Sequence, residues 1–350
     1  QNKELPILPE YVIGYSSGHN EILSLPFFKM RLIQYDEYIS HISYKTTFDV
    51  HESRMVYLDD AFSQAIFITN FIYDDVVVNK VFRETIELET IESFRVIINQ
   101  NVNVNIDDKK IFIREQIEHK IELLKKCSTM YFTSNDDFNR LALDFYLDDE
   151  VKKAFRVHFG EGKSGRLKLF QTLQTFINLN YYFIDKETKH KLYNSNSLFA
   201  KGYLPETPWN RRFFTFKNFM IKKKNITESI LSRSLSDGEY QFLHSIGLAL
   251  IYRDTQSLFL LDEPETHFNP SWRAEYMSAI KNCFQNKTDE KAYSKSELII
   301  TSHSPFIVSD TKEDNVLIFE KDENGLVFCK KVNFNTFGAS VDKITSNIFD

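Results

Sequence analysis

Two adjacent acids, Asp262 and Glu263, follow a short apolar run and could do chemistry together. The run Ser257-Leu-Phe-Leu-Leu precedes them. This pattern predicts a buried strand, and a buried parallel strand delivers its last residue to the sheet edge where α/β proteins bind ligands. The first carboxylate can hold Mg²⁺, and the second can orient and polarise an attacking water. The alternative is a strand that ends in a charged turn.

A second group, Ser236-Asp237-Gly238-Glu239, stands directly before a predicted helix. Gly238 permits close backbone approach, and a helix N-terminus offers free N–H groups and a positive dipole end. The group can therefore receive a phosphate. The alternative is an ordinary helix cap, in which Ser236 or Asp237 caps the helix and Glu239 lies in the first turn.

The third group is the turn Thr301-Ser-His-Ser-Pro305, which follows the apolar run Leu298-Ile-Ile. A histidine at the end of a strand, here His303, can reach a γ-phosphate and sense its presence. The alternative is a loop histidine that caps the next segment. The three groups in this order and at these distances favour one joint site over coincidence.

Such a site needs strands that end together and helices that cover them. Apolar patterning predicts strands at 11–16, 90–104, 213–224, 257–261 and 298–301, and a hairpin with strands 315–320 and 326–332 around Asn324-Gly325. It predicts helices at 59–83, 110–127, 240–253 and 271–284, and a mostly helical stretch from 136 to 185. The order of strands and helices in the second half indicates an α/β fold.

The composition is that of a globular chain long enough for two domains. Of 350 residues, 42% are hydrophobic and 26% are charged, and the net charge of −6 gives no global basic field of a nucleic-acid binder. Ten glycines are few against an ordinary usage of about 7%, which excludes collagen-like and low-complexity chains. The cysteines show no disulfide or metal-ligand spacing, which favours a reducing cytoplasm; they are Cys127, Cys283 and Cys329. No apolar run is long enough for a membrane helix.

Several motifs together resemble a known family. The sequences LSDGE at 235–239, LLDEPE at 260–265 with THFNP at 266–270, and TSHSPF at 301–306 resemble the signature loop, Walker B motif, D-loop and switch histidine of ABC-type ATPases. The resemblance is to the soluble RecF-like and SMC-like branch of AAA family ATPases. YVIGYSSGHNE at 11–21 and NTFGAS at 335–340 extend it to restriction-system-associated AAA family ATPases of bacteria.

This resemblance implies a P-loop NTPase core that binds ATP and Mg²⁺. Asp262 would hold the metal, Glu263 would activate water, and His303 would contact the γ-phosphate. In a head-to-tail homodimer, the residues that meet the γ-phosphate bound by the partner protomer would be Ser236, Gly238 and Glu239. The resemblance also implies a cytoplasmic role in restriction or anti-phage defence, with a partner nuclease or effector, no membrane, and DNA as a further candidate partner.

The phosphate-cradling loop G-x-x-x-x-G-K-[ST] has one imperfect match, at Gly160–Gly165. Its first glycine should fall at Val157, and residues 151–158 do not form a short apolar strand. We therefore expect a turn there, with Lys163 exposed. In the resembling ATPases the loop lies near the N-terminus, upstream of the segment that begins this chain. The simplest hypothesis is an N-terminally truncated ATPase that is inactive as it stands, and the rival hypothesis is a degenerate ATPase.

We expect three regions on this basis. Residues 1–58 would be the remainder of an N-terminal ATPase lobe, 59–212 a mainly helical insertion for recognition, and 213–350 a C-terminal lobe with the three groups described above. The stretch 200–212 is the best linker candidate. The alternative functions are a nucleotide-gated regulatory module without turnover and a RecF-like DNA-repair ATPase.

Overall fold

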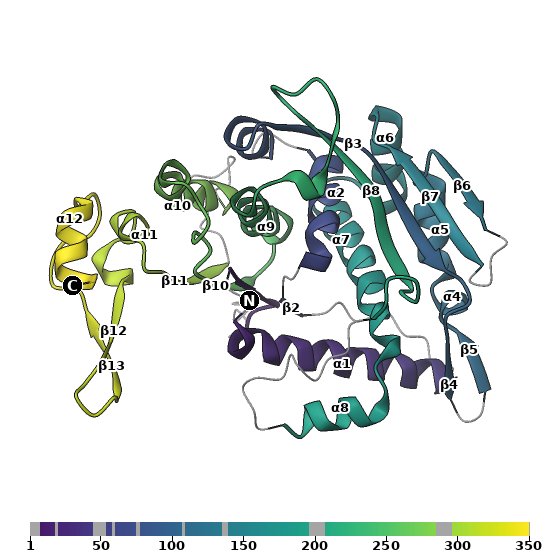
Figure 1. Ribbon diagram of the computed structural model, residues 1–350, viewed down its shortest axis with the longest axis horizontal. Helices are drawn as coiled ribbons and strands as arrows, with labels where there is room; N and C mark the ends of the chain where they lie inside the picture. Colours follow the sequence, from purple (N-terminus) through teal and green to yellow (C-terminus); the bar gives the residue numbers. More distant parts are fainter. Residues whose placement is uncertain are drawn as a thin grey trace, which may run out of the picture.

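The computed structural model describes residues 8–17, 20–44, 54–57, 60–74, 78–106, 109–134, 139–195, 207–284 and 296–349. Within these ranges, a parallel sheet and an antiparallel sheet enclose a layer of helices (Figure 1). The α/β class and the parallel sheet expected from the sequence are confirmed.

The parallel sheet has the strand order β11-β10-β1-β2. Its strands are β1 (Tyr11–Ser16), β2 (Met55–Tyr57), β10 (Ser257–Asp262) and β11 (Glu297–Thr301). Ser16 pairs in register with Asp262, and Asp262 pairs with Thr301. Three neighbouring strands therefore end in one row, and this row is the carboxyl edge of the sheet.

The antiparallel sheet has the strand order β6-β7-β3-β8-β9. Its strands are β3 (Leu88–Asn99), β6 (Met130–Thr133), β7 (Arg140–Tyr146), β8 (Phe214–Lys223) and β9 (Ile230–Leu231). Paired residues on one face are buried and aromatic, as in the stack of Phe94 on Phe145, whose ring centroids are 4.6 Å apart. This face packs on the helical layer and shares one hydrophobic core with the parallel sheet.

The helical layer consists of α2 (Ser63–Ile72), α7 (Gly162–Asn178) and α9 (Asp237–Tyr252), which pack on one another (Figure 1). Almost every residue of α2 and α9 is buried, so these two helices lie at the centre of the helical layer. The amide of Asn70 donates to the carbonyl of Gly247 at 3.1 Å and joins the two helices.

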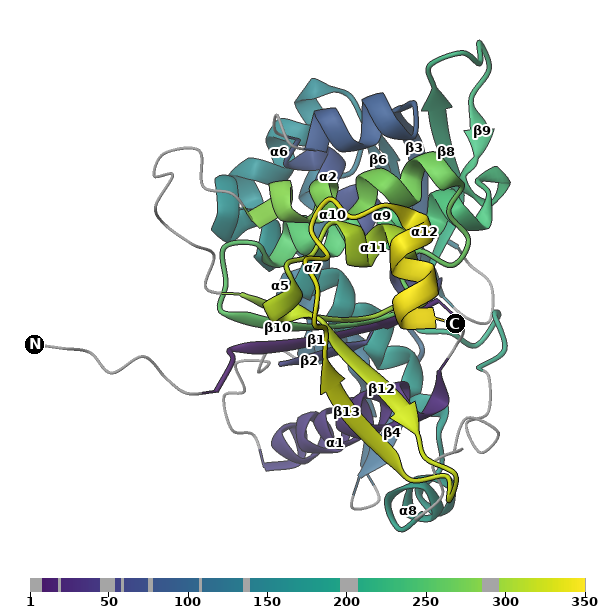
Figure 2. The same cartoon turned by 90° about the vertical axis from the view of Figure 1, so that its left-hand side faces the viewer.

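Two helices cover opposite faces of the parallel sheet (Figure 2). Helix α1 (Glu21–Tyr44) packs on β1 and β2, and α10 (Pro270–Phe284) packs against α9 on the other side. Arg31 of α1 is fully buried, donates to the carbonyl of Tyr57 and to the hydroxyl of Tyr181, and lies over the ring of Phe62. These contacts anchor α1 beneath the sheet.

Shorter elements complete the described chain. The hairpins are β4 (Asn103–Ile106) with β5 (Lys109–Phe112), and β12 (Leu317–Lys321) with β13 (Val327–Lys331). The helices are η1 (Asp60–Phe62), η2 (Asn79–Thr85), α4 (Ile113–Gln116), α5 (Glu118–Cys127), α6 (Asp149–Phe159), η3 (Leu179–Phe183), α8 (Lys186–Tyr193), η5 (Ser232–Ser234), α11 (Pro305–Ser309), η6 (Glu313–Asn315), α12 (Val341–Ile344) and η7 (Thr345–Phe349). The predicted hairpin around Asn324-Gly325 is thereby confirmed.

The mainly helical insertion expected at 59–212 is not confirmed. Strands β3, β6 and β7 of this region form one sheet with β8 and β9 of the expected C-terminal lobe. The prediction of an unbroken helix at 110–127 was wrong at its start, where β5 lies, and the helical prediction for 136–185 was wrong at β7. Strand β5 forms by hairpin pairing with β4, and β7 forms by pairing with β3, which is distant in the sequence. Local periodicity does not record either pairing. Much of the linker candidate lies outside the described residues.

The three cysteines are free thiols. Cys127 and Cys283 are buried, and Cys329 is exposed in the β12–β13 hairpin. Burial raises the pKa of the Cys127 thiol to about 12. Among the helices of the described ranges, none combines the length and the apolarity needed to cross a bilayer.

The glycine cluster at 160–165 joins two helices. Gly160 ends α6 with φ 107°, and α7 begins at Gly162, so no strand leads into this loop as a phosphate-cradling loop requires. A Cβ on Gly165 would lie 1.8 Å from the carbonyl oxygen of Gly160, so the glycine is needed for backbone packing. Lys163 is exposed and pairs with Asp254, in line with the expected turn.

Two substitutions separate the roles of this cluster. Gly165→Ala should lower the free energy of unfolding by about 1–3 kcal/mol or more, because the methyl group overpacks against backbone. Lys163→Ala should cost less than about 1 kcal/mol, since exposed ion pairs stabilise little, and should leave nucleotide binding unchanged. Urea unfolding measures the free energy of unfolding of both variants, and a nucleotide titration measures binding in Lys163→Ala. Loss of nucleotide binding in Lys163→Ala would reinstate the cluster as a phosphate loop.

Candidate functional site

Asp262 lies at the centre of the carboxyl edge of the parallel sheet. The hydroxyl of Thr301 donates to its Oδ1 at 2.6 Å, and the hydroxyl of Ser16 and the amide of Asn20 donate to its Oδ2 at 2.9 and 3.0 Å. Burial raises the pKa of this carboxyl, but the three hydrogen bonds outweigh it and hold the pKa below its ordinary value. The side chain is therefore an ionised carboxylate at neutral pH.

Glu263 follows with an uncommon backbone conformation. Its φ is 50°, in the left-handed region that non-glycine residues rarely adopt, and its N–H donates to the carbonyl of Thr301 at 3.0 Å. Its carboxylate contacts the Nδ1 of His303, and the side chain of His303 is 88% exposed. The structure thus brings Asp262, Glu263 and His303 together, with the catalytic candidates facing solvent and the metal candidate beneath them.

Glu265 is a buried carboxyl that the sequence motifs did not single out as functional. It is 2% exposed, and its Oε2 has no hydrogen-bond partner. Its Oε1 accepts from the hydroxyl of Ser302, whose oxygen also accepts from the N–H of Ser304 at 2.9 Å. Burial raises the pKa of Glu265, and the bond from Ser302 offsets only part of that effect. Glu265 therefore holds the turn that carries His303.

Ser236, Gly238 and Glu239 form a separate group at the start of α9. Ser236 is the N-cap, and it forms a reciprocal capping box with Glu239, which also pairs with Lys223. A Cβ on Gly238 would lie 2.6 Å from the carbonyl oxygen of His267, so this glycine lets the segment that carries His267 approach α9. The cap alternative is confirmed, and the phosphate role of these three residues stays a prediction.

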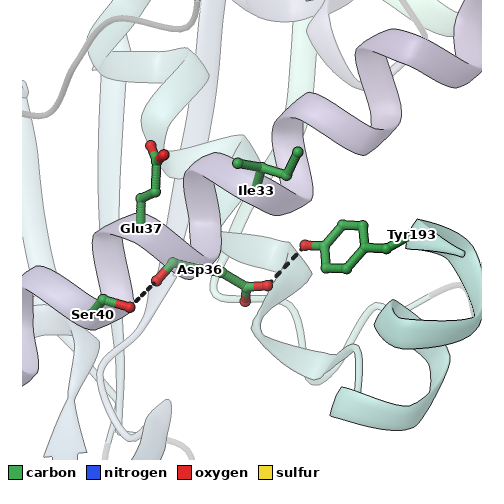
Figure 3. Close-up of a pocket in the computed structure, with 5 residues that line it drawn as sticks. All are labelled: Ile33, Asp36, Glu37, Ser40 and Tyr193. Carbon is green, nitrogen blue, oxygen red and sulfur yellow. Dashed lines mark hydrogen bonds between the residues drawn. The ribbon is translucent and has the colours of Figure 1, made fainter.

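A depression of about 350 Å³ between α1 and α8 is a second candidate for binding (Figure 3). Its acid Asp36 already accepts from the hydroxyl of Tyr193 at 2.8 Å and pairs with Lys189. Figure 3 shows the carboxylate of Asp36 joined to the hydroxyl of Tyr193 across the depression. The carboxyl edge of the parallel sheet is therefore the better candidate site.

A family model described as "AAA domain, putative AbiEii toxin, Type IV TA system" matches residues 128–309, just over half of the chain. The chain belongs to this AAA family. The match includes the segment that carries Ser236, Asp262, Glu263 and His303. It supports the ATPase expectation at the level of the domain, and the ABC-type or SMC-like subtype is a finer assignment that it leaves open.

Two curated proteins are similar to parts of this chain. The Septu protein PtuA of Bacillus thuringiensis is 25% identical over 122 residues, which cover 34% of this chain and 28% of that protein. The Retron Ec83 probable ATPase of Escherichia coli is 24% identical over 186 residues, which cover 49% of this chain and 30% of that protein. The similarity thus spans less than a third of each relative.

The sequence motifs predicted a joint site of Asp262, Glu263 and His303, but they did not predict the side chains that hydrogen-bond to Asp262. Thr301 and Ser16 became visible only through strand register, since each is the last residue of a strand beside β10. Asn20 carried a signal, because it stands directly before a helix in the motif YVIGYSSGHNE. Gly18 and His19 of that motif lie outside the described residues.

The raised pKa of Glu265 predicts a pH-dependent difference between the wild type and Glu265→Gln. A carboxyl whose folded pKa is raised contributes stability below its unfolded pKa and loses it as pH rises through the folded pKa. The free energy of unfolding should therefore shift in favour of the variant as pH rises from 4 to 7, because only the wild type must ionise a buried carboxyl. Urea unfolding at both pH values measures it, with the exposed Glu323→Gln as control. A difference that is constant with pH would contradict an ionisation penalty at Glu265.

Proposed function

We propose that this chain is the catalytic core of an ABC-type, SMC-like ATPase that hydrolyses Mg²⁺-bound ATP. One observation carries the proposal: neighbouring parallel strands bring Asp262, Glu263 and His303 to one edge of the sheet. A cation ligand, a water-orienting carboxylate and a phosphate sensor are the parts that phosphoryl transfer to water requires. The AAA family match supports nucleotide binding in the same segment.

The residues around Asp262 fit Mg²⁺. Its ionised carboxylate and the hydroxyl oxygens of Ser16 and Thr301 are hard oxygen groups. In the described ranges no three His, Cys, Asp or Glu side chains form a metal cluster. One carboxylate fits an ion that takes its other ligands from water and phosphates. The ion would neutralise charge on the β- and γ-phosphates.

Glu263 and His303 would act on the water and the γ-phosphate. Glu263 lies beyond the metal ligand and is partly exposed, so its carboxylate can accept a hydrogen bond from an approaching water. His303 contacts that carboxylate through Nδ1, which leaves Nε2 free to donate toward a phosphate oxygen when protonated. Their contact would hold both side chains in place before substrate arrives.

We infer that a strand–loop–helix unit from outside residues 1–350 supplies the phosphate-cradling loop. Within the described chain β11 pairs only with β10, and Ile299 on it is 55% exposed. Leu258 and Leu260 of β10 are only half-buried, whereas α1 covers β1 and β2. Parallel sheets bury both faces, so a further strand beside β11 and a helix over β10 would complete this one. The loop between them would lie at the edge that carries Asp262.

We also propose a homodimer in which the second group takes part. Ser236 is exposed at the start of α9, where free N–H groups and the helix dipole favour an anion. In a head-to-tail pair, Ser236, Gly238 and Glu239 would meet the γ-phosphate held by the other protomer. ATP would then join the two protomers and hydrolysis would release them.

The biological role that the relatives favour is anti-phage defence. One relative is named as a protein of the Septu system and the other as the probable ATPase of a retron, and the family description names a toxin–antitoxin system. We propose that this ATPase controls a partner effector, such as a nuclease, in a restriction or related defence system, with DNA as a further candidate ligand. A regulatory module without turnover is the competing function.

Glu263→Gln in the full-length protein should lower kcat for ATP hydrolysis by about 10²–10⁴-fold, since it removes the group that takes up the water proton. Binding of ATP and ATP-dependent dimerisation should persist, because Gln keeps the shape of the side chain. Steady-state turnover and light scattering with ATP measure the two effects. The control is Glu297→Gln, at the exposed start of β11. Normal turnover in Glu263→Gln would overturn its role, and no turnover in the wild type would favour the regulatory module.

A further inference from the structure

Asn20, which stands directly before α1, has no role in the proposed function so far. The side chains of Asn20 and Ser16 reach the same oxygen of Asp262, more than 240 residues away along the chain. Ser16 is 7% exposed, so its hydroxyl is enclosed. The contact links the N-terminal segment directly to the metal candidate.

The hydrogen bonds form a closed ring. The backbone N–H of Asn20 donates to the hydroxyl oxygen of Ser16 at 3.3 Å, and that hydroxyl donates to Asp262 Oδ2 at 2.9 Å. The side-chain amide of Asn20 closes the ring with its 3.0 Å bond to the same oxygen. The other end of the amide accepts from the N–H of Leu23 at 3.2 Å, which caps α1.

This double use explains why asparagine stands at residue 20. Ser and Asp cap helices as well as Asn does, but an ionised Asp has no donor, and the hydroxyl of Ser is too short to accept from the helix and also reach a carboxylate. The orientation of the amide follows from the chemistry, since a flipped amide would set its oxygen against Asp262 and its N–H₂ against the N–H of Leu23. Asn20 thus joins the first turn of α1 to the orientation of Asp262.

We propose that Asn20 is a positioning residue for the metal-binding carboxylate, so that the place where α1 begins sets the orientation of Asp262 toward Mg²⁺. The inference deepens the proposed function and rests on it for the metal. Helix α1 is held at Arg31 by the carbonyl of Tyr57 and the hydroxyl of Tyr181. Because the side chain of Asn20 bonds both the first turn of α1 and Asp262, a displacement of α1 would turn the carboxylate of Asp262. Occupation of the metal site would in turn hold α1 in place.

The first experiment tests the contact without metal. Asn20→Asp keeps the size of the side chain and the cap acceptor, but it replaces the amide donor with a second carboxylate facing Asp262. In EDTA its Tm should fall by about 2–4 °C relative to the wild type. The swapped pair Asn20→Asp with Asp262→Asn restores one carboxylate and one amide and should regain most of that loss. Asn335→Asp is the matched control, because Asn335 is exposed and also accepts from a backbone N–H.

The second experiment adds MgCl₂ at constant ionic strength. Mg²⁺ alone should raise the Tm of Asn20→Asp more than that of the wild type or of Asn335→Asp, because the cation neutralises the facing carboxylates. Asn20→Ser keeps a cap acceptor but replaces the N–H₂ group with a hydroxyl on a shorter side chain, which moves the donor away from Asp262. Its Tm should stay within about 2 °C of the wild type, while the Mg²⁺ concentration for half-maximal ATPase in the full-length protein should rise several-fold.

The outcomes distinguish this inference from the function on which it rests. Equal Tm values for Asn20→Asp and Asn335→Asp in EDTA, or no recovery in the swapped pair, would overturn the contact while ATPase activity persists. A contact confirmed in EDTA without any selective effect of Mg²⁺ would reduce Asn20 to a structural cap and overturn the proposal. Absence of turnover in the wild type, with the EDTA and Mg²⁺ results intact, would overturn the ATPase and leave Asn20 in its role.

Discussion

The shared register of β1, β10 and β11 is the constraint on which the rest of the site depends. Because Ser16, Asp262 and Thr301 are opposite one another, the hydroxyls of two strands meet the carboxylate of the third. A slip of one residue in any strand would turn its last side chain to the other face of the sheet. Phe259 and Leu261 of β10 are buried, and the ring of Phe259 packs on Phe284 of α10; the burial of these side chains opposes that slip.

Two carboxyls near this edge occupy opposite environments. Asp262 receives three hydrogen bonds that favour its ionised form, whereas Glu265 is almost fully buried with a single donor and one unpartnered oxygen. The first is suited to a cation and the second to holding a turn. The same short segment thereby separates a charged carboxylate at the surface from a structural carboxyl beneath it. Ser302 donates to Glu265 and accepts from the N–H of Ser304, and these two serines flank His303.

The sequence predicts those elements that are specified by neighbouring residues, and it does not predict those that depend on pairing with distant strands. The strands β1, β10 and β11 and the hairpin at Asn324-Gly325 were predicted because local apolar runs and a turn dipeptide specify them. Strand β7 was not, because it forms by pairing with β3 and β6 within a helix-rich region. The chemistry-bearing residues Asp262 and His303 carry their own signals, whereas Thr301 matters only through the register of its strand.

The left-handed backbone at Glu263 has a consequence for how this protein can evolve. A non-glycine residue held in that region costs of order 1 kcal/mol or more, and glycine would remove the cost. Glycine would also remove the carboxylate that contacts His303. Selection for stability alone would therefore drive this residue away from glutamate, so that stability and the proposed chemistry compete at one position of the chain.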